Sequence, residues 1–211
     1  AGRGGVIVWS YQFSCHTLIG KALAAAGLSG VRVSASVHGF SSTDIGKKTI
    51  NRIAVAAENR YLADRLVFDR EDAQAVTRRI AGKLAAGDIL LMANNVFAGS
   101  AFVEMPIGES GFVSMPTTPL SFAVRRGTPL FLACVIELEP FTTYAVHFVE
   151  TSAVPAGEGA KLRDHEAMAR IALHARDTLF DHMTAWPDQF ILWPGRARSY
   201  LDAGRQVPEA V

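Results

Sequence analysis

Short apolar runs alternate with longer amphipathic segments along almost all of this 211-residue chain, and this alternation limits its fold more than any other feature. In the clearest pair, residues 72–86 have the periodicity of an amphipathic helix that stops at Gly87, and a buried strand follows at 89–93. Further strands are predicted at 5–10, 31–37, 66–68, 129–137 and 144–149, and helices at 17–27, 44–63, 119–126 and about 161–184. The order predicts one α/β domain over residues 1–211, with a mixed, mostly parallel central sheet flanked by helices.

Two segments carry no such pattern. Residues 96–116 are rich in glycine and proline and are predicted to be irregular, and residues 151–160 are predicted to form a loop. The strands at 129–137 and 144–149 are close enough in the chain to pair as a hairpin.

Composition and charge exclude several classes of protein. A net charge of +1 gives no electrostatic basis for binding nucleic acid. No apolar run reaches the roughly 18 residues of a membrane span, and no signal-peptide pattern is present. Cys15 and Cys134 form no redox or metal motif. We therefore expect a cytoplasmic protein without an integral membrane span, a metal or a cofactor.

Polar residues follow several of the predicted strands. In parallel sheets, ligands bind beyond the carboxyl ends of the strands. Four segments, 10–17, 38–44, 94–100 and 109–116, are therefore expected to meet at one crevice.

Four stretches in order also resemble a known family. They are GGVIVWSYQFSCHTLIGKALAAAG, AVTRRIAGKLAAGDILLMANN, SMPTTPLSFAVRRGTPLFLACVI and PDQFILWPGRARS, and together they span most of residues 5–199. They resemble the lipid A late acyltransferases of the lysophospholipid acyltransferase-like superfamily. The resemblance implies an acyltransferase-like α/β fold and a site in the first turn after the first strand.

The positions that carry that family's chemistry differ here. Its general-base histidine and the carboxylate that orients it correspond to Gln12 and Thr17, which can do neither task. Its later Asp-Gln pair reads Asn94 and Asn95. Its paired aromatic residues fall near Glu109 and Ser110. These changes predict a site rebuilt for a small polar substrate.

The resemblance also concerns what precedes the first strand. The family carries a membrane-associated helical segment there, whereas this sequence begins almost at the strand. Two explanations stay open: either the sequence is trimmed at its N-terminus, or a small partner chain covers the apolar surface that this segment would otherwise bury.

Three residues are candidates for proton transfer. His16, in the first turn, and His38, after the second predicted strand, are each either a displaced base or a histidine with a local structural role. Asp44 either receives a substrate amine or caps the next helix. Cys15 is either a nucleophile near a helix start or a small buried side chain.

Other residues are candidates for binding the substrate or the leaving group, through amide, hydroxyl or ammonium groups. Each could instead close a turn or face solvent. They are Gln12, Ser14, Thr17, Asn94, Asn95, Glu109, Ser110, Ser114 and Lys161.

Three functions remain open. In the first, a biosynthetic enzyme for small molecules such as natural products lets a substrate amine displace an anionic or thioester leaving group, by transfer between two molecules or by ring closure. A free amine needs positioning more than a base, which fits the loss of the histidine. The second is acyl transfer from a carrier-linked or CoA-linked donor with His16 or His38 as the base. The third is a non-catalytic binding subunit.

Overall fold

The structure is a computed structural model of the chain. It describes residues 4–35, 41, 43–68, 73–94, 102–107, 111–151 and 164–191.

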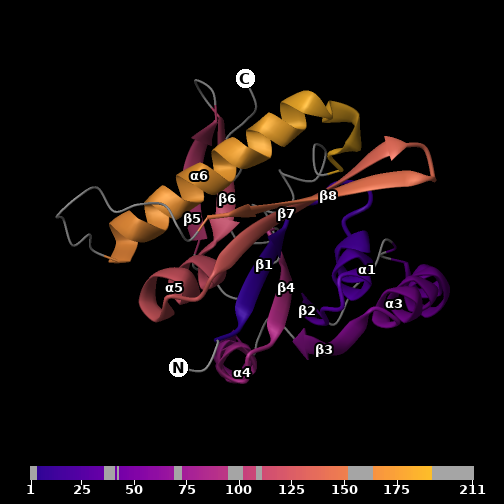
Figure 1. Ribbon diagram of the computed structural model, residues 1–211, viewed down its shortest axis with the longest axis horizontal. Coiled ribbons are helices and arrows are strands. Elements are labelled where there is room, and N and C mark those ends of the chain that lie inside the picture. The colour runs from indigo at the N-terminus through magenta and orange to yellow at the C-terminus, as the bar shows by residue number, and fades with distance from the viewer. Residues whose placement is uncertain are drawn as a thin grey trace.

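A six-stranded sheet forms the centre of the molecule (Figure 1). Its strands are β1 (Val6–Ser10), β2 (Gly30–Ala35), β3 (Leu62–Phe68), β4 (Ile89–Ala93), β7 (Leu130–Glu139) and β8 (Thr143–Glu150). They lie in the order β3-β2-β4-β1-β7-β8, and all neighbours are parallel except β7 and β8, which form an antiparallel pair. The predicted mixed, mostly parallel sheet and its hairpin are confirmed.

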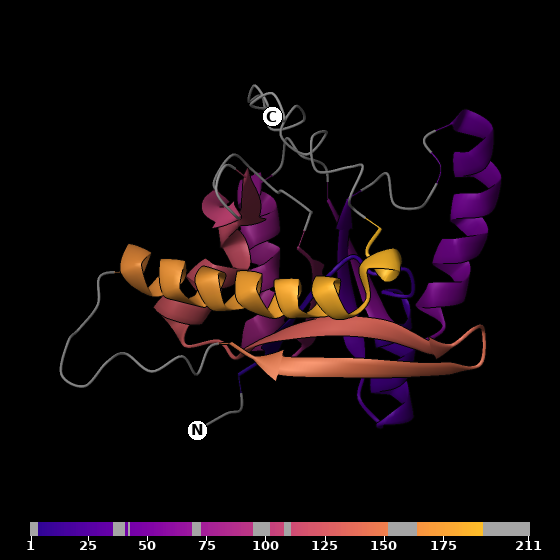
Figure 2. The same ribbon diagram turned by 90° about the horizontal axis from the view of Figure 1, so that it is seen from above.

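Helices cover both faces of this sheet (Figures 1 and 2). They are α1 (Leu18–Ala25), α2 (Asp44–Gly46), the π-helical turn η1 (Lys47–Asn51), α3 (Arg52–Asn59), α4 (Ala73–Ala85), α5 (Thr117–Arg126), α6 (Asp164–Ala185) and the short 3-10 helix η3 (Pro187–Gln189). No helix in the described ranges is long and apolar enough to cross a membrane.

The strand side chains alternate between two apolar clusters. On β1, Ile7 and Trp9 pack in the larger cluster with residues of α4, α5 and α6. Val8 packs in the smaller cluster with Ile19 and Leu23 of α1. This alternation fixes the register of the central strand, because a shift of one residue would exchange the two faces.

Glycine ends three of the helices as the sequence predicts. Gly27, Gly87 and Gly127 follow α1, α4 and α5 with φ of 74°, 90° and 62°. At positive φ the Cβ atom of other residues clashes with the backbone, and glycine has no Cβ. Each of these helices therefore ends at its glycine.

Two predictions about elements are wrong. Residues 96–116 are not wholly irregular, since β5 (Phe102–Ile107) and β6 (Gly111–Pro116) pair as a separate antiparallel hairpin. The helix predicted at 44–63 ends at Asn59, and β3 starts at Leu62, earlier than the predicted 66. No glycine or proline marks that boundary in the sequence.

Helix α6 docks on β8 through two histidines. His147 Nδ1 lies 3.1 Å from His182 Nε2, and His182 Nδ1 lies 2.8 Å from the carbonyl oxygen of Thr178. That carbonyl can only accept, so His182 Nδ1 carries a proton, and with both rings neutral Nε2 accepts from His147. The indole of Trp186 packs against both rings at 5.8 Å. Burial, and secondly His182, lowers the pKa of His147 below its ordinary value.

The lowered pKa of His147 predicts that the folded protein loses stability in mild acid. The unfolded chain takes up a proton on His147 near pH 6.5, whereas the folded chain does so only at lower pH. The stabilisation is therefore complete above pH 6.5 and declines as the pH falls below it.

We expect the free energy of unfolding, measured with urea, to fall from pH 7 towards pH 5. His147→Phe should reduce that slope, and a matched change at the exposed His165, His165→Asn, should leave it unchanged. Equal slopes in the wild type and His147→Phe would contradict this role for the pair.

Candidate functional site

The candidate site lies at the carboxyl ends of β1 and β4, the two central strands. The backbone N–H of Asn94 donates to the carbonyl oxygen of Ser10 at 2.9 Å, which continues the pairing of these strands by one residue. The hydroxyl of Ser10 donates to the carbonyl of Met92 at 3.2 Å. Of the predicted substrate residues, Gln12 and Asn94 are thus brought to adjacent strand ends, where ligands of parallel sheets bind.

Several polar atoms at or next to these strand ends are buried and have no hydrogen-bond partner among the residues that the structure describes. They are the indole nitrogen of Trp9, the amide nitrogen of Gln12 and both amide atoms of Asn94. Asn94 is only 1% exposed and Gln12 only 7%. An unmade hydrogen bond of a buried group costs about 1–3 kcal/mol. A polar ligand that completed the bonds of one of these groups would remove its cost, so each group has the chemistry of a binding residue.

His16 is the buried base of the first turn. Its Nδ1 lies 3.0 Å from the carbonyl oxygen of Phe13, which also accepts the backbone N–H of His16 at 3.1 Å. Because this carbonyl can only accept, Nδ1 carries the proton and Nε2 is the basic atom. The local hydrogen bond that the sequence offers as one role for His16 is confirmed. It also fixes the tautomer that a general base needs.

The turn is held from the far end of the chain. The N–H of Ser14 donates to the carbonyl of Gln189 at 2.8 Å, and the rings of Phe13 and Phe190 lie 5.4 Å apart. Gln189 is fixed in turn by Glu137 of β7, whose N–H and carbonyl bind its side-chain amide at 2.8 and 2.9 Å. The segment after α6 therefore positions the first turn, a role that the sequence did not reveal.

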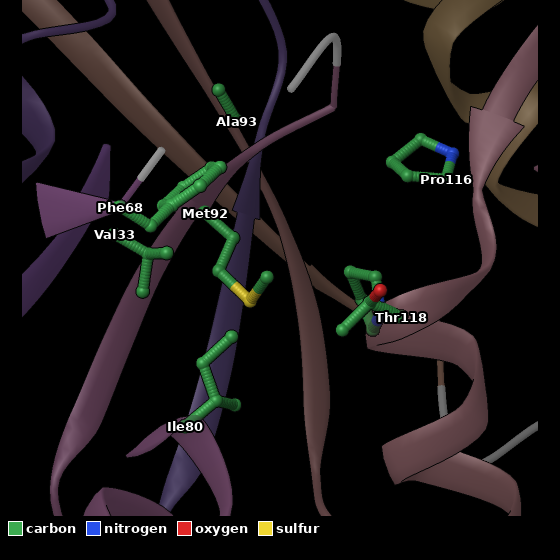
Figure 3. Close-up of a pocket in the computed structure, with 8 residues that line it drawn as sticks. Val33, Phe68, Ile80, Met92, Ala93, Pro116 and Thr118 are labelled. Atoms are coloured by element: carbon green, nitrogen blue, oxygen red, sulfur yellow. The ribbon is translucent and has the colours of Figure 1, made fainter. Parts of the chain in front are cut away.

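A small apolar pocket includes Ala93, the last residue of β4, in its lining (Figure 3). Its volume is about 10 Å³, enough for about one water molecule. The lining residues come from β2, β3, α4, β4, β6 and α5 and are Val33, Phe68, Ile80, Met92, Ala93, Pro116, Thr118 and Pro119. Only Thr118 brings a side-chain hydroxyl.

Two predicted residues are not buried as these groups are. Asp44 is 93% exposed in the first turn of α2, with Lys47 Nζ 3.8 Å from its carboxylate. The cap of that helix is Thr43, whose hydroxyl accepts the N–H of Gly46 at 3.1 Å. Thr17 is half-buried at the N-terminus of α1, and its side chain makes no capping bond.

The two cysteines differ in their surroundings. Both are free, and burial in the core raises the pKa of Cys134 to about 12, so this side chain remains a thiol. Cys15 is half-buried in the first turn, with its sulfur 3.8 Å from the hydroxyl of the exposed Ser14.

The other predicted site residues cannot be placed. Ser114 lies in β6 opposite Glu104, but its side chain is outside the described part of the structure. Five more lie outside the described residues altogether, namely His38, Asn95, Glu109, Ser110 and Lys161.

Trp9, one residue before the end of β1, carries an unpaired buried group that the sequence did not reveal. Its apolar ring belongs to the larger core cluster, and its position in an apolar strand gives the same signal as an ordinary core residue. Only the structure shows that its N–H has no partner in the described ranges. The available signal is that a buried indole N–H usually needs an acceptor.

No metal site emerges from the described ranges, where no three histidine, cysteine or acidic side chains are grouped so that they could hold an ion. In the comparisons with known proteins, no protein-family model and no curated protein matches this chain.

Proposed function

We propose that this chain is an enzyme that binds a small polar substrate at the ends of β1 and β4, where a substrate amine displaces an anionic or thioester leaving group. The proposal places this reaction on an acyltransferase-like scaffold. It covers both transfer between two substrates and ring closure within one.

The observation that carries the proposal is the buried amide of Asn94, whose two polar atoms have no hydrogen-bond partner among the described residues. The amide nitrogen of Gln12 is buried and unpaired in the same ranges. An amide N–H donates to a carbonyl oxygen and to the oxyanion that develops when that carbonyl is attacked. The amide oxygen of Asn94 can accept from an ammonium or amine N–H. The amide of Asn94, with one donor and one acceptor, therefore suits both partners in an attack of an amine on a carbonyl.

The reaction is balanced without any further reagent. The lone pair of the neutral amine forms a C–N bond to the carbonyl carbon, and the carbon–sulfur or carbon–oxygen bond of the leaving group breaks. The nitrogen loses one proton to solvent or to His16 Nε2, and a thiolate leaving group takes up one proton. A neutral amine is already a nucleophile, so positioning supplies the main part of the rate enhancement.

A second candidate is acyl transfer to a hydroxyl group with His16 as general base. It is favoured by the buried position of His16 and by its Nδ1 contact with Phe13, which leaves Nε2 as the basic atom. A hydroxyl must lose its proton as it attacks, so this reaction depends on the histidine far more than amine transfer does.

The two candidates differ in the expected effect of His16→Gln. We would incubate the protein with short acyl-CoA thioesters or acyl phosphates and a panel of primary amines and alcohols, and measure release of thiol or phosphate. Amine-dependent release that falls less than about tenfold in His16→Gln supports the proposal. Alcohol-dependent release that falls about 100-fold or more supports acyl transfer.

Asp44→Asn is the matched control for this experiment. Asp44 is almost wholly exposed, so the release of thiol or phosphate should be unchanged in this variant. A loss of that release would indicate that Asp44 binds the substrate amine. If neither donor is consumed faster with an acceptor than without one, the proposed reaction is wrong.

A further inference from the structure

The helix formed by α2, η1 and α3 turns its isoleucines away from the protein. Ile45, Ile50 and Ile53 are 79%, 57% and 71% exposed, and we call them the isoleucine face. The helix stands at one end of the molecule beside the edge strand β3 (Figures 1 and 2). A cluster of large exposed apolar residues on one element usually marks an interaction surface.

The buried side of the same helix is polar. Gly46, Asn51 and Glu58 are its buried residues. The Asn51 amide binds the backbone N–H and carbonyl of Ser41 at 2.9 and 2.8 Å. The usual pattern of a surface helix is thus reversed, since apolar residues normally face the core. Packing among the described residues gives no reason for these isoleucines, which are all more than half exposed.

The π-helical turn brings the isoleucines together. Ile45 and Ile53 are eight residues apart, which in an uninterrupted α-helix would separate them by about 80° around the axis. The extra residue of the π-turn between them, at 47–51, reduces this offset. Both side chains therefore approach the same side of the helix.

Cations flank the isoleucine face. Lys47, Lys48 and Arg52 are exposed, and the one acid on the exposed part of the helix is Asp44, 3.8 Å from Lys47. A helix with a basic flank and an exposed apolar side is the form that lies in the interface of an anionic membrane. Each cation near such a surface strengthens binding through its negative potential.

We propose that the isoleucine face and its flanking cations dock the protein on an anionic lipid surface. This inference is independent of the proposed reaction. A second copy of the chain is a poorer fit, because a two-fold contact through this helix would bring Lys48 and Arg52 towards the same cations of the other copy. An anionic lipid surface can bury the isoleucine face among its acyl chains and attract Lys48 and Arg52 to its headgroups at the same time.

Sedimentation with vesicles tests the proposal. We expect the wild type to bind phosphatidylglycerol vesicles, to bind phosphatidylcholine vesicles weakly, and to be released from phosphatidylglycerol by salt. Ile45→Ser with Ile53→Ser should lower the partition coefficient at least about tenfold for each isoleucine removed. Lys48→Glu with Arg52→Glu should lower it on phosphatidylglycerol by at least about fivefold for each cation.

The matched control carries the same kinds of change on another helix, Leu173→Ser with Arg170→Glu on α6, where both residues are also exposed. It should bind as the wild type does. Circular dichroism and urea unfolding verify that every variant is folded. The proposal is overturned if the wild type fails to bind phosphatidylglycerol, if the isoleucine variant binds like the wild type, or if the control loses as much. A lipid-free dimer that the isoleucine changes disrupt would assign the face to a second copy instead.

Discussion

Glu58→Leu is expected to lower the free energy of unfolding by about 3–5 kcal/mol. The carboxylate of Glu58 binds two buried guanidinium groups, with Oε1 2.5 Å from a terminal nitrogen of Arg32 and Oε2 2.5 Å from one of Arg65. The register of β2 and β3 places these arginines side by side. Removing the acid therefore leaves two neighbouring buried cations without their counter-charge.

Urea unfolding measures this effect, and the m-value verifies that the unfolding reaction is the same in each variant. The matched control is Asp164→Asn, which breaks the exposed pair with Arg125 at 3.0 Å and should change the free energy by about 1 kcal/mol or less. Replacing Arg32 and Arg65 with methionine together with Glu58→Leu should recover much of the loss, because no buried charge then remains. If Glu58→Leu behaves like Asp164→Asn, the buried ion cluster does not hold α3 on the sheet.

The central sheet could be predicted because its signals are local. The strand at 89–93 and the helix before it depend on short-range periodicity and on Gly87, and the structure reproduces both almost residue for residue. The hairpin of β7 and β8 follows from closeness along the chain. Signals of this kind need no knowledge of the rest of the fold.

The hairpin of β5 and β6 could not be predicted for two reasons. Its glycines and Pro106 gave the composition of a loop, and proline is normally excluded from a sheet interior. In a two-stranded sheet, however, each strand has one edge without a partner, where the missing N–H of Pro106 is tolerated.

Side-chain partners from distant segments were also beyond the sequence. Glu58 has the pattern of an ordinary acid at the end of a helix, and only the pairing of β2 with β3 shows that it meets Arg32 and Arg65. At the candidate site, the sequence predicted Gln12 and Asn94 at strand ends. It did not show that the nitrogen of the Gln12 amide and both amide atoms of Asn94 are buried with no partner among the described residues. It did not show that Asp44 turns to solvent, because the direction of a side chain at a helix start depends on the chain around it.

Asn94→Leu is expected to remove binding of the substrate and, at the same time, to stabilise the protein. Both amide atoms of Asn94 are buried and unpaired within the described part of the chain, so an apolar side chain of similar shape removes a desolvation penalty of about 1–3 kcal/mol. Natural sites that carry such a penalty trade stability for function. With the acyl donors and amines described above, turnover by this variant should fall about 100-fold or more, the loss expected when an oxyanion donor is removed.

Asn51→Leu provides the matched control. Asn51 is also buried, but both of its amide atoms bind the backbone of Ser41. The same substitution there leaves the Ser41 groups without their partners and should lower the free energy of unfolding by about 1–3 kcal/mol.

The difference in unfolding free energy between each of these two variants and the wild type is the most direct test of the claim that the ends of β1 and β4 form a binding site. The account predicts opposite signs, with Asn94→Leu more stable than the wild type and Asn51→Leu less stable. A loss of stability in Asn94→Leu as large as that in Asn51→Leu would show that the amide of Asn94 serves the fold, and would contradict the assignment of this site.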